Sequence, residues 1–295
     1  MRFGLLLFSV IIIGGFIFWR DISSVVLGTG TEAQASFKKV KKAATELSIT
    51  NKWDLPGELK EVSGIAYLDQ DRFACIQDED GIIFIYNRAE GKVEKRIEFA
   101  GPGDYEGITV NGNTAYIVRA DGRLYKVDMN AGKSSVKEFK TSLTVDHNVE
   151  GLVFDKKNNR LLLAIKDEEP GNKDYKGIYA FDLASEKLNN DPVIKIDLDD
   201  PLLSSGDKKK KKKAIMPSSI GIHPLTGEIY ITDGPKSRLA ILQPSGKILK
   251  VIELGKEFAQ PEGVSFSPSG DLFISNEGTS KPGNIIELKL ESARK

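Results

Sequence analysis

Cysteine and histidine are scarce in this 295-residue chain. Cys75 is the single cysteine, so no intramolecular disulfide can form, and we expect no disulfide-linked partner. The two histidines, His147 and His223, are too few to favour a zinc site or a Ser-His-Asp triad. The sequence therefore predicts a fold stabilised by packing.

An excess of charge of either sign is also missing. Acidic and basic side chains number 42 each, so no overall positive field points to nucleic acid as a partner. The strongest local charge is the lysine run at residues 208–213. We interpret this run as a solvated loop, with binding of anionic lipid or a polyanion as the alternative.

A long uncharged apolar run occurs at the N-terminus, at residues 3–19, flanked by Arg2 and Arg20. Its length is at the short end for a membrane-spanning helix, and Trp19 beside Arg20 is typical of an interfacial anchor. We predict an uncleaved single-pass signal anchor at residues 1–20, with a cleaved signal peptide as the alternative, and a polar tether at 21–45. The inner or plasma membrane would then be a partner, and the following domain would be exported to the periplasm or the extracellular side.

A short phrase recurs five times: a small or acidic residue, usually a glycine, and an aliphatic residue that opens a strand-like run. Its first members are Ser63, Glu106, Glu150, Ser218 and Glu262, at intervals of 43, 44, 68 and 44 residues. A strand-rich period in the forties is the signature of β-propeller blades. We therefore predict an all-β propeller at residues 46–292 with five blades, and six blades as the alternative because of the long third interval.

The repeats divide into strand-like runs, four in most cases, but the fifth repeat ends after three. Residues 47–55 resemble the outermost strands elsewhere and lead directly into the first phrase. We predict that this N-terminal strand completes the fifth blade and closes the ring, because closure removes exposed sheet edges. We assign the excess length of the third interval to residues 201–214.

Acidic residues gather at one end of the predicted strands. Because propeller strands alternate in direction, each innermost strand begins, and each second strand ends, at the same channel mouth. Crowded carboxylates repel one another or require a cation, and oxygen donors without histidine or cysteine favour calcium. The candidate metal ligands are Glu106, Glu150, Glu262, Asp78, Asp167 and Glu277. The alternative is structural, with each repeat glutamate accepting backbone N–H bonds from a neighbouring blade.

The repeat phrases resemble the SdiA-regulated, YjiK-like family of bacterial envelope proteins. The resemblance rests on residues 61–67, 103–108, 149–152, 159–164 and 261–264. It implies a propeller, an N-terminal membrane segment and a link to calcium binding or calcium homeostasis, with kinship to phytase-like and lactonase-like propellers. The chain departs from the repeat at Ser218-Ser219, so we expect no ligand from the fourth blade, and a bound cation displaced from the axis.

These observations favour a membrane-anchored envelope propeller that binds calcium at an acidic channel mouth, with a sensing, scaffolding or homeostatic role. One alternative is a calcium-dependent hydrolase of a phosphate ester or lactone, in which Lys166 and Arg119 would supply positive charge near the mouth. A second alternative is a metal-free platform for another envelope protein. The pattern identifies no catalytic residue and favours a protein that is not an enzyme.

Overall fold

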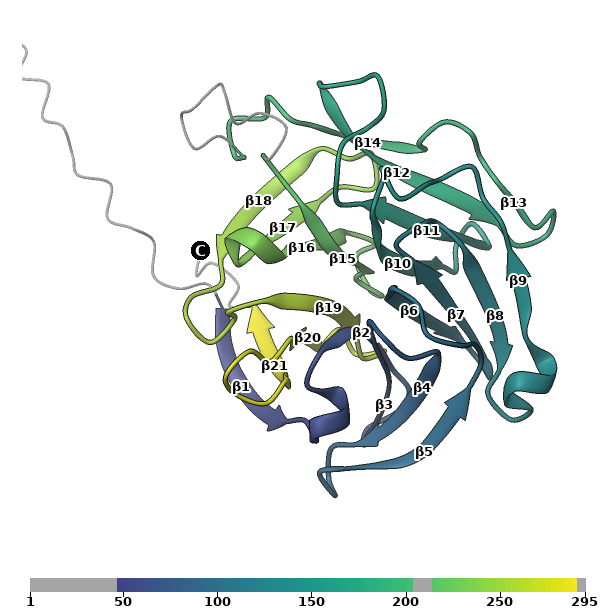
Figure 1. The fold of residues 1–295 in the computed structure, drawn as a ribbon. Helices are drawn as coiled ribbons and strands as arrows, with labels where there is room; N and C mark the ends of the chain where they lie inside the picture. Colours follow the sequence, from purple (N-terminus) through teal and green to yellow (C-terminus); the bar gives the residue numbers. More distant parts are fainter. Residues whose placement is uncertain (1–46, 204–213, 291–295) are drawn as a thin grey trace, which may run out of the picture. The chain divides into compact units, whose positions relative to one another are not determined.

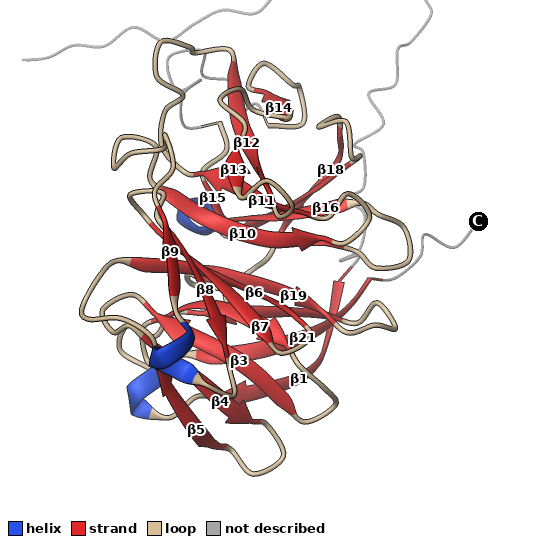
Figure 2. Cartoon of the chain, turned by 90° about the vertical axis from the view of Figure 1, so that its right-hand side faces the viewer, coloured by secondary structure: helices blue, strands red, loops and turns tan. Residues whose placement is uncertain are grey.

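The computed structural model describes residues 47–203 and 214–290, in which five antiparallel sheets surround a central channel (Figure 1). Strands and the loops that join them dominate these residues, and the helices drawn in Figure 2 are short turns. The fold is a five-bladed β-propeller, so the prediction of five blades is confirmed and the six-blade alternative is wrong.

The first two blades have the regular four-stranded form, and their strands are listed here from the channel outward. The first blade contains β2 (Val62–Tyr67), β3 (Arg72–Gln77), β4 (Ile82–Asn87) and β5 (Lys92–Glu98). The second contains β6 (Tyr105–Asn111), β7 (Thr114–Arg119), β8 (Leu124–Asp128) and β9 (Lys137–Phe139).

The third blade is irregular, and it explains the long repeat interval. It contains β10 (Val149–Asp155), β11 (Arg160–Ile165), β12 (Tyr175–Asp182), β13 (Lys187–Leu188) and β14 (Ile194–Asp197). Both β13 and β14 pair with β12. The extra length is therefore shared among the loop at 166–174, the segment at 183–193 and the connection that follows β14. The assignment to residues 201–214 alone was too narrow.

The last two blades complete the ring. The fourth contains β15 (Pro217–Ile222), β16 (Ile229–Asp233), β17 (Arg238–Leu242) and β18 (Ile248–Glu253). The fifth contains β19 (Pro261–Phe266), β20 (Leu272–Asn276), β21 (Asn284–Leu290) and β1 (Leu47–Asp54).

Closure by the N-terminal strand is confirmed. β1 pairs antiparallel with β21, from Leu47 opposite Leu290 to Asp54 opposite Asn284 (Figure 1, purple beside yellow). The first and last described strands thus share one sheet, which leaves β21 paired on both sides.

Apolar side chains form five clusters, one between each pair of neighbouring blades. Between the fifth and first blades, for example, Phe273 packs edge-on against Phe73 with ring centroids 5.0 Å apart. Burial between blades holds each sheet upright and orders the innermost strands around the channel.

No helix among the described residues is long and apolar enough to cross a membrane. The predicted anchor at 1–20, the tether at 21–45 and the lysine run at 208–213 all lie outside the described residues.

Candidate functional site

The innermost strand of every blade carries a β-bulge at the same end. The pairing register shifts at the residue that begins each repeat phrase, namely Ser63, Glu106, Glu150, Ser218 and Glu262. A bulge leaves one residue out of the ladder and re-aims its side chain. The repeat phrase is therefore a bulge signature, and the bulge turns side chains toward the channel mouth.

The glycine after the bulge is needed because the next blade approaches closely. A Cβ atom on Gly107 would lie 2.8 Å from the Glu150 carbonyl oxygen, and one on Gly263 would lie 3.0 Å from the Ile65 amide nitrogen. In the fourth blade Ser219 stands at this position, and its hydroxyl accepts the Val264 N–H at 3.2 Å. This bond accounts for the replacement of the repeat glycine there.

The two bulge serines join neighbouring blades. Ser63 Oγ donates to the Tyr105 carbonyl at 2.7 Å, and Ser218 Oγ donates to the Pro261 carbonyl at 2.6 Å. Both hydroxyls are buried and hydrogen-bonded to backbone. The first and fourth blades therefore use the bulge position for structure.

The three bulge glutamates meet at one cavity of about 100 Å³ at the channel mouth. Its lining is acidic and consists of Glu61, Val62, Ser63, Asp78, Glu106, Glu150, Lys166, Gln260, Glu262 and Glu277. Five of the six residues predicted as metal ligands are thus brought together. The sixth, Asp167, is not part of this lining, although its charge contributes to raising the pKa of Glu150.

Lys166 lies among the carboxylates. It follows β11 directly, and its Nζ is 2.7 Å from Glu150 Oε1, which also accepts a bond from Asn148 Nδ2 at 3.1 Å. The other oxygen, Glu150 Oε2, is buried and has no hydrogen-bond partner among the described residues. Arg119, the other expected cation, pairs with Asp121 at 2.9 Å and does not line the cavity.

Burial and mutual repulsion raise the pKa values of these carboxyl groups well above their ordinary range. Burial, followed by repulsion from neighbouring acids, raises the pKa of Glu106 to about 9 and that of Glu262 to about 8. Burial raises the pKa of Glu150 to about 7, although Lys166 opposes the shift. Burial alone would lower the pKa of Lys166, but the surrounding glutamates raise it overall.

None of the three glutamate carboxylates accepts a backbone N–H bond in the described part of the chain. Such bonds would lower a carboxyl pKa, whereas all three values are raised. The structural alternative, in which each glutamate accepts N–H bonds from a neighbouring blade, is therefore wrong.

A second, buried lysine holds the loop that carries Lys166. Lys176 is 1% exposed, and its Nζ donates to the Lys166 carbonyl at 2.8 Å and to the Asp167 carbonyl. Burial lowers the pKa of Lys176 to about 8. In the same loop, Glu169 accepts a bond from the Tyr179 hydroxyl. These contacts fix the backbone from which Lys166 reaches Glu150.

Sequence reasoning missed Glu61 and Gln260, although a signal for them exists. Gln260 Nε2 donates to Glu277, and Glu61 lines the cavity from the first blade. Each stands two residues before a bulge position, as do Asp104 and Asn148. Aligning the repeats at this second position would have identified an outer polar set.

A calcium ion was predicted at this mouth, and the donor atoms of the lining are of the type that calcium prefers. The lining offers carboxylate and amide oxygens, which hard cations prefer, and Glu150 Oε2 is buried without a partner. Across residues 47–203 and 214–290, however, no three histidine, cysteine or acidic side chains are already grouped closely enough to hold a metal ion. The carboxylates surround Lys166 instead of a preformed coordination sphere.

The fold and this mouth define the class: a five-bladed β-propeller whose acidic side chains are supplied by bulges of the innermost strands. Within that class the chain belongs to the SdiA-regulated family, whose family model matches residues 38–280. The resemblance carried by the repeat phrases is thereby confirmed. No curated protein matches the chain at a significant level.

Solved structures share the fold at low identity. A glutaminyl cyclase from Myxococcus xanthus has a TM-score of 0.58 at 14% identity, covering 84% of this chain and 97% of that chain. A Bacteroides thetaiotaomicron protein of unknown function has a TM-score of 0.52 at 14% identity, covering 78% and 58% respectively. The PQQ-bound aldose sugar dehydrogenase of Streptomyces coelicolor has a TM-score of 0.50 at 12% identity, covering 82% and 97%. These likenesses concern the fold alone.

Proposed function

We propose that this protein is a membrane-anchored envelope propeller that binds calcium at its acidic mouth, in a sensing, scaffolding or homeostatic role. The observation that carries the proposal is the convergence of Glu106, Glu150 and Glu262 on one small cavity beside a single lysine. When ionised, these three carboxylates carry more negative charge than one ammonium neutralises, and a divalent cation would balance the excess.

Calcium is the cation that this donor set favours. It accepts six to eight oxygen ligands in flexible geometry, whereas magnesium demands a near-ideal octahedron. Glu106, Glu150 and Glu262 would hold the ion, and Asp78 and Glu277 of the same lining would add further carboxylate oxygens. Asp78 Oδ1 is also buried without a hydrogen-bond partner among the described residues, which supports its place in the set.

Binding requires two changes within the cavity. The protons held by the glutamates must leave, and the Lys166 ammonium must move away from Glu150 Oε1. Lys166 therefore acts as an internal counter-ion that a metal replaces. Calcium affinity should rise between pH 6 and pH 9, because only the ionised carboxylates bind metal.

The anchor and the exported location are part of the same proposal. In the fifth blade Leu47 pairs with Leu290 of β21. Two residues away, Leu288 pairs with Leu272, which pairs in turn with Phe266, the last residue of β19. The first described strand therefore begins at the end of the propeller opposite the acidic mouth.

Thermal unfolding of the full-length protein, in 1 mM calcium or in chelator, tests calcium binding. Calcium at 100 times its dissociation constant adds about 2.7 kcal/mol of stability. Glu106→Gln, Glu150→Gln and Glu262→Gln should each reduce the rise in melting temperature, whereas Glu257→Gln, on the exposed pair with Lys52, should leave it unchanged. A folded protein that shows no shift at millimolar calcium would contradict the proposal.

Lys166 also favours a second candidate, the calcium-dependent hydrolase, because an anionic substrate needs a cation beside the metal. Purified protein would be assayed with phytate, aryl phosphates and lactones, with and without calcium. Metal-dependent turnover that disappears in Glu150→Gln would favour the enzyme. If calcium stabilises the protein and none of these substrates turns over, the binding role is favoured.

A further inference from the structure

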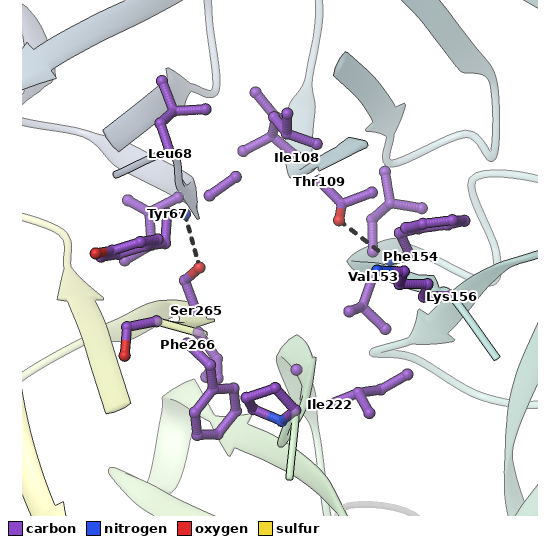
Figure 3. A pocket seen from close by; sticks show the side chains of 18 of the residues that line it. Tyr67, Leu68, Ile108, Thr109, Val153, Phe154, Lys156, Ile222, Ser265 and Phe266 are labelled. Carbon is purple, nitrogen blue, oxygen red and sulfur yellow. Dashed lines mark hydrogen bonds between the residues drawn. The ribbon is translucent and has the colours of Figure 1, made fainter. Parts of the chain in front are cut away.

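A second and larger cavity lies at the other end of the channel. Its volume is about 370 Å³, near the lower end of the roughly 300–1,000 Å³ range of small-molecule sites. It is lined by the last residues of the five innermost strands, whereas the acidic cavity is lined by their first residues. Figure 3 shows the side chains arranged as a ring around an open centre.

The wall of this cavity presents mainly carbon. All five innermost strands contribute apolar side chains, among them Ile108, Val153 and Ile222. Two wall hydroxyls are already used between blades: Ser265 Oγ accepts the Tyr67 N–H at 2.8 Å, and Thr109 Oγ1 accepts the Phe154 N–H at 3.1 Å (Figure 3). Ser267 Oγ bonds to Asp271 at 2.6 Å, and the lining also includes the hydroxyl-bearing Tyr67. A ligand would therefore meet mainly apolar surface.

One charged side chain belongs to the lining, and it is positive. Lys156 is exposed and directly follows Asp155, the last residue of β10 in the third blade (Figure 3). In the part of the chain that the structure describes, no carboxylate lies within ion-pair distance of Lys156. The neighbouring Asp155 forms an ion pair with Arg160, with 2.9 Å between Asp155 Oδ2 and Arg160 Nε. Lys156 is thus an available cation beside an apolar cavity.

We propose that this cavity binds a small organic acid, with an aromatic ring or a short aliphatic chain inside and the carboxylate at Lys156. The volume suits a single ring system or one short chain and not a two-chain lipid. The apolar part supplies most of the affinity, and the ion pair at an exposed lysine selects the anion. This site is separate from the acidic mouth, and it does not depend on calcium.

Calorimetric titration of the full-length protein in lipid nanodiscs tests the proposal, with 2-naphthoate as the probe and empty discs as the partition control. The neutral analogue 2-naphthamide measures the contribution of charge. We expect saturable naphthoate binding, with the amide up to about fivefold weaker. Lys156→Ala should remove that difference, and Lys157→Ala, next to it but outside the lining, should preserve it.

Two cavity-filling variants act from different blades. Val153→Phe and Ile222→Phe should each lower the affinity for both probes about tenfold or more. The melting temperature of each variant shows whether it is folded. Glu150→Gln, at the far mouth, should leave naphthoate binding unchanged. Uptake no greater than in empty discs, equal affinity for acid and amide in the unmodified protein, or full binding in both filled variants would each overturn the proposal.

Discussion

Replacing Glu262 by glutamine should stabilise the metal-free protein while reducing its response to calcium. Glu262 is 8% exposed, and burial followed by repulsion from Glu150 raises its pKa to about 8. A carboxyl with a raised pKa binds more protons in the folded chain than in the unfolded chain. Its contribution to stability is complete below pH 4.5 and is lost as the pH rises toward 8. Glutamine keeps the shape and removes the titration.

The expected magnitude follows from the pKa shift. The ordinary pKa of the carboxyl is 4.5, about 2.5 units below pH 7. Ionisation at pH 7 therefore stabilises the unfolded chain by about 1.36 kcal/mol for each of these units, whereas the folded carboxyl stays mostly protonated. The variant should therefore be about 3 kcal/mol more stable at pH 7. At pH 5 the same reasoning gives less than about 1 kcal/mol.

Urea unfolding at pH 5, 6, 7 and 8 in chelator measures this difference. The gap between the variant and the unmodified protein should widen steadily with pH. Glu257→Gln removes an exposed carboxyl and provides a matched control, whose effect should be small and independent of pH. A Glu262→Gln protein that is less stable throughout, or more stable by the same amount at every pH, would refute the reasoning.

Three further predictions follow from the ring and its mouth. Lys166→Met should destabilise the metal-free protein by about 2 kcal/mol at pH 8, because Glu150 loses its counter-ion, and should enlarge the calcium-induced rise in melting temperature. Gly263→Ala should destabilise by about 1–3 kcal/mol in urea unfolding, because its Cβ would clash with Ser275 Oγ of its own blade and with Ile65 of the first blade. Gly57→Ala, with no atom within 4 Å, should change stability by less than about 0.5 kcal/mol. Removing residues 1–54 should expose β21 and cause association in size-exclusion chromatography with light scattering, and removing residues 1–46 should leave a monodisperse propeller.

The blade count and the closure were predictable because they depend on periodicity and chain length. Five phrases gave five innermost strands, and a repeat one strand short required a partner, which the segment at residues 47–55 supplied. The convergence of the glutamates was predictable for a related reason. Alternating strand direction places the first residue of every innermost strand at one mouth, whatever the details of packing.

The place of Lys166 near the mouth was predicted from sequence, but its ion pair with Glu150 was not. Lys166 sits at the start of the 166–174 loop, in the one blade whose connections depart from the repeat. Its position depends on Lys176, whose burial nothing in the local pattern signals. The apolar cavity was missed for another reason: residues such as Val153 and Ile222 alternate like any half-buried strand residue, so sequence does not separate a channel wall from a core.

Side-chain length at the bulge position decides whether a blade uses that residue for an inter-blade hydrogen bond or presents it to the cavity. Where a serine occupies the bulge, its hydroxyl reaches a backbone carbonyl of the next blade and is fully used. Where a glutamate does, the carboxylate accepts no backbone bond in the described part of the chain and faces the cavity with a raised pKa. A purely structural ring would gain stability by using serine throughout, because three acids with raised pKa values lower stability at neutral pH. Such a loss of stability is typical of a site retained for binding, which is why the calcium response, and not stability, should decide the role of Glu106, Glu150 and Glu262.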